Sequence, residues 1–279
     1  MVDRRTELSQ LRGVLAECAS GGGATVLVTG GLASGKSTLL AAFADVAAEQ
    51  GAVLLTATGT RLEQSVRMGV VWQLLGSAPL PAGVPERVAG LIDGDGDSDG
   101  VAAGVRAAHG LCGVLLGLAE DAPLVVVVDD LQFADDATLQ VLTTLRRRAR
   151  AARVMLVLGE WDRPGMARSL AVAELTRAAT VEVRLGPLSE AAVARVAAGV
   201  LEPKAAALLT PALHALSGGS PALVHALVAD CRELGPDADR PVPGTAFRRA
   251  VLDCLHRWDP DVLRVAGGLA VLGGHAGAE

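Results

Sequence analysis

Two stretches of the sequence combine residue types that could handle phosphate groups and a metal ion. The first, GGLASGKS at 30–37, has the spacing G-x-x-x-x-G-K-[ST]. Backbone N–H groups of such a loop point at phosphate oxygens, and glycine lets the backbone approach them without a Cβ clash. The second, LVVVVDD at 124–130, is an apolar run that ends in two carboxylates. Together they predict a site for ATP or ADP with Mg²⁺.

Each polar residue of the two stretches has an expected role. Lys36 would place its charge at the β and γ phosphates, and Ser37 would offer its hydroxyl to Mg²⁺. Asp129 would hold the metal, directly or through water, and Asp130 would polarise the attacking water. The expected catalytic residues are therefore Lys36, Asp129 and Asp130. The other loop residues expected against the nucleotide are Gly30, Gly31, Leu32, Ala33, Ser34, Gly35 and Thr38.

Strand-like apolar runs alternate with helical stretches, a pattern typical of an α/β fold with a parallel sheet. Each run is rich in Val and Leu, as in strands buried on both faces. The predicted strands are Thr25–Thr29, Val53–Ala57, Leu124–Asp129, Val154–Leu158 and Val181–Leu185. A helix is expected from Gly35 to about Gln50. The fold class predicted is a P-loop NTPase with a five-stranded parallel sheet.

After residue 185 the pattern becomes helical, without another clear strand. Helical periodicity covers 190–201, 204–216, 221–234, 245–258 and 260–272, and GPDADRPVPG at 235–244 is typical of a linker. We expect a nucleotide-binding domain at 1–186, a helical lid at 187–235, a linker at 236–244 and the start of a truncated, winged-helix-like domain at 245–279.

Composition excludes several classes of function. The net charge is −6 and the chain has three Trp, three Phe and no Tyr, which disfavours nucleic-acid binding. The four cysteines are widely spaced, so we interpret them as reduced core residues. No signal peptide and no membrane span is predicted, and we expect a cytoplasmic protein.

Three charged stretches favour structural roles over chemistry. DGDGDSDG at 93–100 resembles a calcium loop, but Arg106 stands where the bidentate glutamate is required, so we expect a solvated acidic loop. Asp135 and Asp136 should cap a helix at 137–149. RRRAR at 146–150 should close that helix against its dipole, with DNA contact or an arginine finger as alternatives.

Several stretches in order resemble the STAND class of signal-transduction ATPases. They are VDRRTELSQL at 2–11, the phosphate loop, GVVWQLL at 69–75, PLVVVVDDLQFADDATL at 123–139, LGPLSEAAV at 185–193, SGGSPALV at 217–224 and AFRRAVLDCLHR at 246–257. The resemblance covers the whole chain. It is most specific to the N-terminal region of the large ATP-binding LuxR-type transcriptional regulators found in antibiotic biosynthesis gene clusters.

The resemblance implies further nucleotide contacts. Val2 and Arg4 would run beside the adenine, Pro187 would open the lid, and Pro221 would approach the nucleotide. GP at 186–187 and SGGSP at 217–221 could equally be a domain-boundary turn and a helix stop. Arg163 matches the family's γ-phosphate sensor only with a displacement, and a surface-turn arginine is the alternative.

The function expected is a regulatory switch that binds ATP or ADP, hydrolyses ATP slowly and self-associates in the ATP state. The helical middle and C-terminal helix-turn-helix of the regulators are absent from this sequence, so no direct DNA binding is expected. The alternative is a P-loop ATPase of the motor or loader type that turns over rapidly, or a kinase.

Overall fold

The computed structural model describes residues 3–93, 101–162, 169–235, 240–258 and 260–271. Residue contacts divide the chain after Leu185 into two units, and the second unit also includes residues 32–35. No helix among the described residues is both long and apolar enough to span a membrane. Of the acidic stretch at 93–100, predicted to be a solvated loop, Asp93 is the last residue of a helix and residues 94–100 lie outside the described residues.

The first unit is built on one parallel sheet. Within the described residues its strands are β1 Ala24–Gly30, β2 Val53–Thr58, β3 Leu124–Asp129, β4 Val154–Trp161 and β5 Val181–Leu185. Their spatial order is β2-β3-β4-β1-β5, and all pairs are parallel. The predicted α/β class with a five-stranded parallel sheet is confirmed. β4 is longer than predicted, because its ladder with β1 continues to the pair Gly30 and Trp161.

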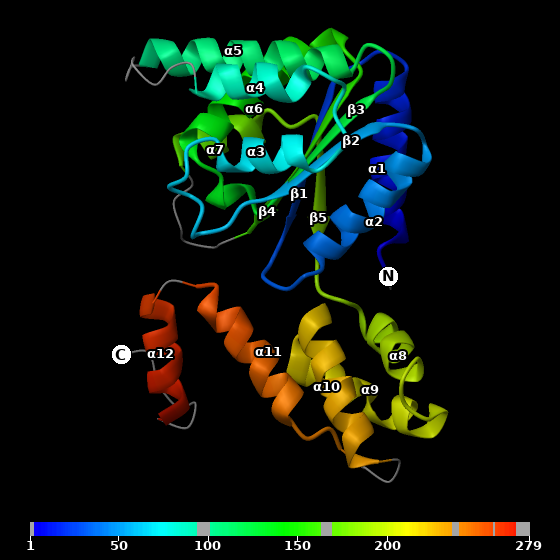
Figure 1. The fold of residues 1–279 in the computed structure, drawn as a ribbon. Helices are drawn as coiled ribbons and strands as arrows, with labels where there is room; N and C mark the ends of the chain where they lie inside the picture. The colour runs from blue at the N-terminus through cyan, green and yellow to red at the C-terminus, as the bar shows by residue number, and fades with distance from the viewer. Residues whose placement is uncertain (1–2, 94–100, 163–168, 236–239, 259, 272–279) are drawn as a thin grey trace. The chain divides into compact units, whose positions relative to one another are not determined.

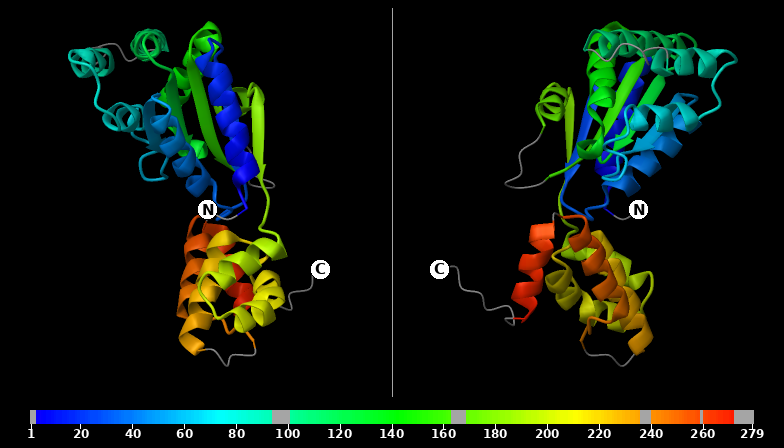
Figure 2. Two further views of the ribbon diagram at one scale, coloured as in Figure 1. Left: turned by 90° about the vertical axis from the view of Figure 1, so that its right-hand side faces the viewer. Right: turned by 60° about the vertical axis from the view of Figure 1, so that its left-hand side comes forward.

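Helices cover both faces of the sheet (Figures 1 and 2). Helices α1 Arg5–Ala19 and α2 Lys36–Glu49 pack on one face. The other face is covered by α3 Gly69–Gly76, α4 Val84–Asp93, α5 Val101–Leu118, α6 Asp136–Arg148 and α7 Leu170–Arg177. Short 3-10 turns, η1 Leu131–Phe133 and η2 Ala149–Ala151, flank α6.

Successive side chains of a strand point to opposite faces of the sheet, and because both faces are buried at the central strands, their apolar runs are unbroken. In β3, Leu124, Val126 and Val128 belong to one core cluster, and Val125 and Val127 belong to the other. Every residue of β3 and β4 is buried. Such strands position functional groups only where they end, since their interior side chains are committed to the two cores.

The second unit is helical. Its helices are α8 Glu190–Ala198, α9 Pro203–Ser217, α10 Pro221–Leu234, α11 Thr245–His256 and α12 Pro260–Val271. Helices α8, α9 and α10 share an apolar core, against which Phe247 of α11 packs. The finer division into lid, linker and a further domain stays a prediction.

The Asp230 carboxylate connects α10 to the start of α11 through hydrogen bonds. Asp230 on α10 is 4% exposed. Its oxygens accept from the backbone N–H groups of Gly244 at 2.8 Å, Ala246 at 3.0 Å and Phe247 at 2.9 Å. A Cβ on Gly244 would lie 2.6 Å from Asp230 Oδ1. Asp230 therefore satisfies N–H groups at the start of α11 that have no partner within that helix.

Candidate functional site

The phosphate loop joins β1 to α2, as its sequence predicts. Gly30 ends β1, α2 begins at Lys36, and the turn between them contains Ala33 at φ +56° and Gly35 at φ +91°. Residues 31–34 form the rest of this turn, and Thr38 lies on the exposed side of the first turn of α2. The loop therefore lies at the carboxyl edge of the sheet, before a helix N-terminus suited to an anion.

Lys36 is 7% exposed and folds back over its own loop. Its Nζ donates to the carbonyl oxygens of Gly30 and Gly31, both at 3.0 Å. Its stem is buried with the start of α2, so the ammonium is held at the loop and not in solvent. This is the position from which a lysine can meet phosphate oxygens.

Ser37 and Asp129 come together although they are 92 positions apart in the sequence. The Ser37 hydroxyl donates to Asp129 Oδ2 at 2.5 Å, and Asp129 Oδ1 accepts from the backbone N–H of Asp130 at 2.8 Å. Asp129 is 7% exposed at the end of β3. A hydroxyl and a carboxylate oxygen are ligands that suit Mg²⁺, which takes its remaining ligands from water and substrate phosphates. The two side chains therefore fit a magnesium ion.

Two glycines that sequence reasoning missed make room for these acids. A Cβ on Gly159 of β4 would lie 2.6 Å from Asp129 Oδ1 and 2.9 Å from Leu40 Cδ1. A Cβ on Gly59, which follows β2, would lie 2.6 Å from the carbonyl oxygen of Asp130. Nothing in the local sequence marks either glycine, because the close contact arises only when neighbouring strands pair.

Asp130 follows the strand in a left-handed conformation, with φ 49° and ψ 46°. Asp tolerates this region better than most residues do. Its side chain accepts from Gln132 Nε2 at 2.8 Å. The structure therefore brings Lys36, Ser37, Asp129 and Asp130 to one edge of the sheet.

Another acid lies next to the last residue of the neighbouring strand. Glu160 of β4 is 2% exposed and is in register with Thr29 of β1, one residue before the phosphate loop. The resemblance led us to expect positive charge in this part of the chain. The residue expected to supply it, Arg163, lies outside the described residues, as does Val2.

The remaining predicted residues lie elsewhere. Arg4 precedes α1, is 7% exposed and forms an ion pair with Glu7 at 3.1 Å. In the helical unit, Pro187 lies beside Gly219, where a Cβ would approach the Pro187 Cβ to 2.9 Å. Leu188 N donates to Gly219 O at 2.8 Å. This unit thus brings together the segments that contain Pro187 and Pro221, and their roles toward a nucleotide stay predictions.

The predicted roles at α6 are confirmed for Asp135 and for Arg146–Arg148, whereas Asp136 is the first residue of the helix and Arg150 lies beyond its end in η2. Asp135 is the N-cap, and it accepts from Thr138 N at 2.9 Å and from Thr138 Oγ1 at 2.5 Å. The same carboxylate accepts from Met68 N at 2.9 Å, where α3 begins. Arg146, Arg147 and Arg148 occupy the last turn of α6.

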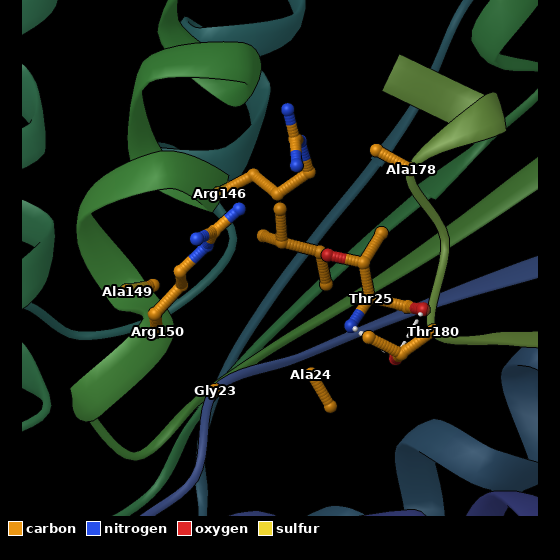
Figure 3. A pocket seen from close by; sticks show the side chains of 9 residues that line it. Gly23, Ala24, Thr25, Arg146, Ala149, Arg150, Ala178 and Thr180 are labelled. Atoms are coloured by element: carbon orange, nitrogen blue, oxygen red, sulfur yellow. Dashed lines mark hydrogen bonds between the residues drawn. The ribbon is translucent and has the colours of Figure 1, made fainter. Parts of the chain in front are cut away.

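A pocket of about 110 Å³ lies at the amino edge of the sheet (Figure 3). It is lined by Gly23, Ala24, Thr25, Arg146, Ala149, Arg150, Leu156, Ala178 and Thr180. The strands begin here, whereas the phosphate loop follows the end of β1. Arg146 lies in the last turn of α6 and Arg150 in the following turn η2, near the negative end of the helix dipole, which favours cations. We therefore do not assign this pocket to the nucleotide.

Cys18, Cys112 and Cys231 are buried, as expected of core residues, whereas Cys254 is only partly buried. Burial raises the pKa of the Cys112 thiol to about 12, and it also raises the pKa of Cys18, Cys231 and Cys254. A raised pKa keeps the thiol protonated and unreactive at neutral pH. Among the described residues, no group of three or more His, Cys, Asp or Glu side chains could hold a metal.

Comparison with known proteins agrees with this geometry. Residues 1–158 match the family model described as "AAA ATPase domain". No curated protein matches the chain.

Solved structures with a similar fold include the ORC2 protein of Aeropyrum pernix in its ADPNP–ADP complexes. Its TM-score is 0.56 at 16% identity, over 91% of this chain and 68% of that protein. The Aeropyrum pernix ORC1 protein in complex with DNA gives 0.53 at 16% identity, over 91% and 66%. Cdc6p from Pyrobaculum aerophilum gives 0.52 at 13% identity, over 84% and 63%. The chain thus spans about two thirds of each, and the likeness concerns the fold.

Proposed function

Because the chain belongs to the family of AAA ATPase domains, we propose that it is a nucleotide-dependent switch. It binds ATP or ADP with Mg²⁺ and hydrolyses ATP slowly. The observation that carries the proposal is the convergence of Lys36, Ser37, Asp129 and Asp130 at one edge of the sheet.

The division of labour follows from these contacts. The loop N–H groups and Lys36 hold the phosphates. Ser37 and Asp129 hold Mg²⁺, which when bound neutralises phosphate charge. Asp130, the next residue, accepts a proton from the attacking water.

Slow hydrolysis is supported by the side chain near the end of β4, which is an acid and not a cation. Phosphoryl transfer is accelerated by cationic groups placed against the developing negative charge. Glu160 of β4 is a buried acid, and it is in register with Thr29, the residue directly before the phosphate loop. A site that hydrolyses ATP slowly is suited to a switch, because the bound nucleotide then lasts long enough to act as a signal.

We further propose that the switch belongs to a transcriptional regulator of the LuxR type and self-associates in the ATP state. The support is the order of sequence stretches, above all AFRRAVLDCLHR at 246–257. The net charge of −6 favours contacts with protein over DNA, so the chain itself should not bind a promoter.

The experiment is to denature the purified chain, identify the released nucleotide by chromatography and time its exchange against a fluorescent analogue. Tightly held ADP that exchanges over many minutes supports the switch. Rapid multiple turnover without a partner would instead support a motor-type ATPase. Light scattering with ATP and with ADP tests self-association, and a promoter titration near physiological salt tests DNA binding.

A further inference from the structure

The Gln132 side chain bridges the segment after β3 and the end of β4. Its Nε2 donates to Asp130 Oδ1 at 2.8 Å, and its Oε1 accepts from the backbone N–H of Trp161 at 3.1 Å. A carboxylate can only accept and a backbone N–H can only donate, so the orientation of the amide follows from its partners. Glutamine meets both demands because it carries a donor and an acceptor on one planar group.

The backbone of Asp130 is already fixed by other contacts. Its N–H donates to Asp129 Oδ1 at 2.8 Å, and its carbonyl oxygen accepts from Phe133 N at 2.9 Å. Gly59 lies against that same carbonyl. These contacts fix the backbone, and the hydrogen bond from Gln132 to Oδ1 restrains the rotation of the Asp130 carboxylate.

The other end of the Gln132 bridge, at Trp161, lies in the strand pair of β4 and β1, and β1 leads into the phosphate loop. Trp161 is 4% exposed and is in register with Gly30, the first residue of the loop. The next residue, Asp162, donates its N–H to Gly30 O at 3.1 Å, and the same oxygen accepts from Lys36 Nζ. Gln132 therefore links the acid expected to activate water to the element that positions Lys36.

We propose that Gln132 is a positioning residue that sets the direction of the Asp130 carboxylate relative to the phosphate loop. This inference rests on the proposed function, because it assigns a role in the hydrolysis step. Gln132 acts through Asp130, because the hydrogen bonds of its side chain go to Asp130 Oδ1 and to the backbone N–H of Trp161. Its loss should consequently lower kcat and spare the affinity for Mg-ATP.

The test compares Gln132→Met with the wild type, with Asp130→Asn and with the double variant. Methionine keeps the length of the side chain but provides neither hydrogen bond. Gln140→Met, a partly buried glutamine on α6, is the matched control. Phosphate release gives kcat and KM, calorimetry gives Mg-ATP affinity, and thermal unfolding reports on folding.

We expect Gln132→Met to lower kcat about tenfold or more, since hydrogen bonds to charged groups are among the stronger ones. Affinity for Mg-ATP should stay within about twofold, and the control should behave as wild type. In the Asp130→Asn background Gln132→Met should have little further effect, because residues that act as a unit are not additive.

Three outcomes overturn the inference, and they are distinguishable. Wild-type kcat in Gln132→Met means that the bridge does not serve hydrolysis. Equal losses in affinity, stability and kcat, additive with Asp130→Asn, mean that Gln132 only holds the fold together. A wild-type chain that binds Mg-ATP but never hydrolyses it refutes the proposed hydrolysis itself, and this inference with it.

Discussion

Replacing Gly159 by alanine should displace the Asp129 carboxylate, which belongs to the candidate metal site. The added Cβ would lie 2.6 Å from Asp129 Oδ1, about 0.8 Å short of ordinary contact, which begins at 3.4 Å. Leu40 Cδ1, at 2.9 Å, and Asp129 Cα, at 3.3 Å, are also closer to the added Cβ than ordinary contact. The Asp129 carboxylate must therefore move, and with it the oxygen that Ser37 contacts.

The expected cost follows from that displacement. Overpacking a buried site costs about 1–3 kcal/mol, which for a chain of this size lowers the melting temperature by roughly 2 to 12 °C. A catalytic group misplaced by about 1 Å can lose about 10²-fold in rate. We expect Gly159→Ala to fold and to lose 10- to 100-fold in Mg-dependent hydrolysis, as estimated from that displacement.

The assay is phosphate release over a Mg²⁺ titration, together with thermal unfolding. Gly13→Ala on the exposed side of α1 is the control, because nothing lies within 4 Å of its added Cβ. That substitution should be neutral or stabilise by up to about 1 kcal/mol. Wild-type stability and turnover in Gly159→Ala would refute the packing of Asp129 against β4.

Four further predictions concern separate parts of the chain. Lys36→Ala should remove most of the affinity for ATP, because the phosphates lose their counter-charge; unchanged affinity in calorimetry would rule out the phosphate-loop assignment. Asp130→Asn should keep Mg-ATP binding and lower hydrolysis by about 10²- to 10⁴-fold, and wild-type phosphate release would remove Asp130 from the mechanism. Asp230→Ala should destabilise the helical unit by about 2–4 kcal/mol, since three backbone N–H groups lose their acceptor; denaturant unfolding against the exposed Asp253→Ala checks this, and equal midpoints would contradict it. The pKa of Cys112 is raised to about 12, so the thiolate is scarce at pH 8 and Ellman's reagent should react with Cys112 only after unfolding; rapid labelling of Cys112 itself in the native chain would contradict its burial.

The sequence by itself determined the elements whose signals are local. The central strands β3 and β4 were predictable as apolar runs, whereas β5 alternates apolar with charged residues because only one of its faces is buried. The N-cap Asp135 was predictable because it stands directly before a helical pattern. The phosphate loop was predictable because its residues, Gly30 to Ser37, are contiguous in the chain and form one local pattern. These features depend on backbone conformation and burial within a few residues.

Only the tertiary structure decided which distant residues meet. The bond from Gln132 to Trp161 and the room that Gly159 leaves for Asp129 both arise when β3 and β4 pair. Asp230 likewise meets the start of α11 across the linker. A glycine, a glutamine or an aspartate has no distinctive local pattern at such positions. Its role depends on which strand or helix becomes its neighbour, and that is fixed by packing of the whole core.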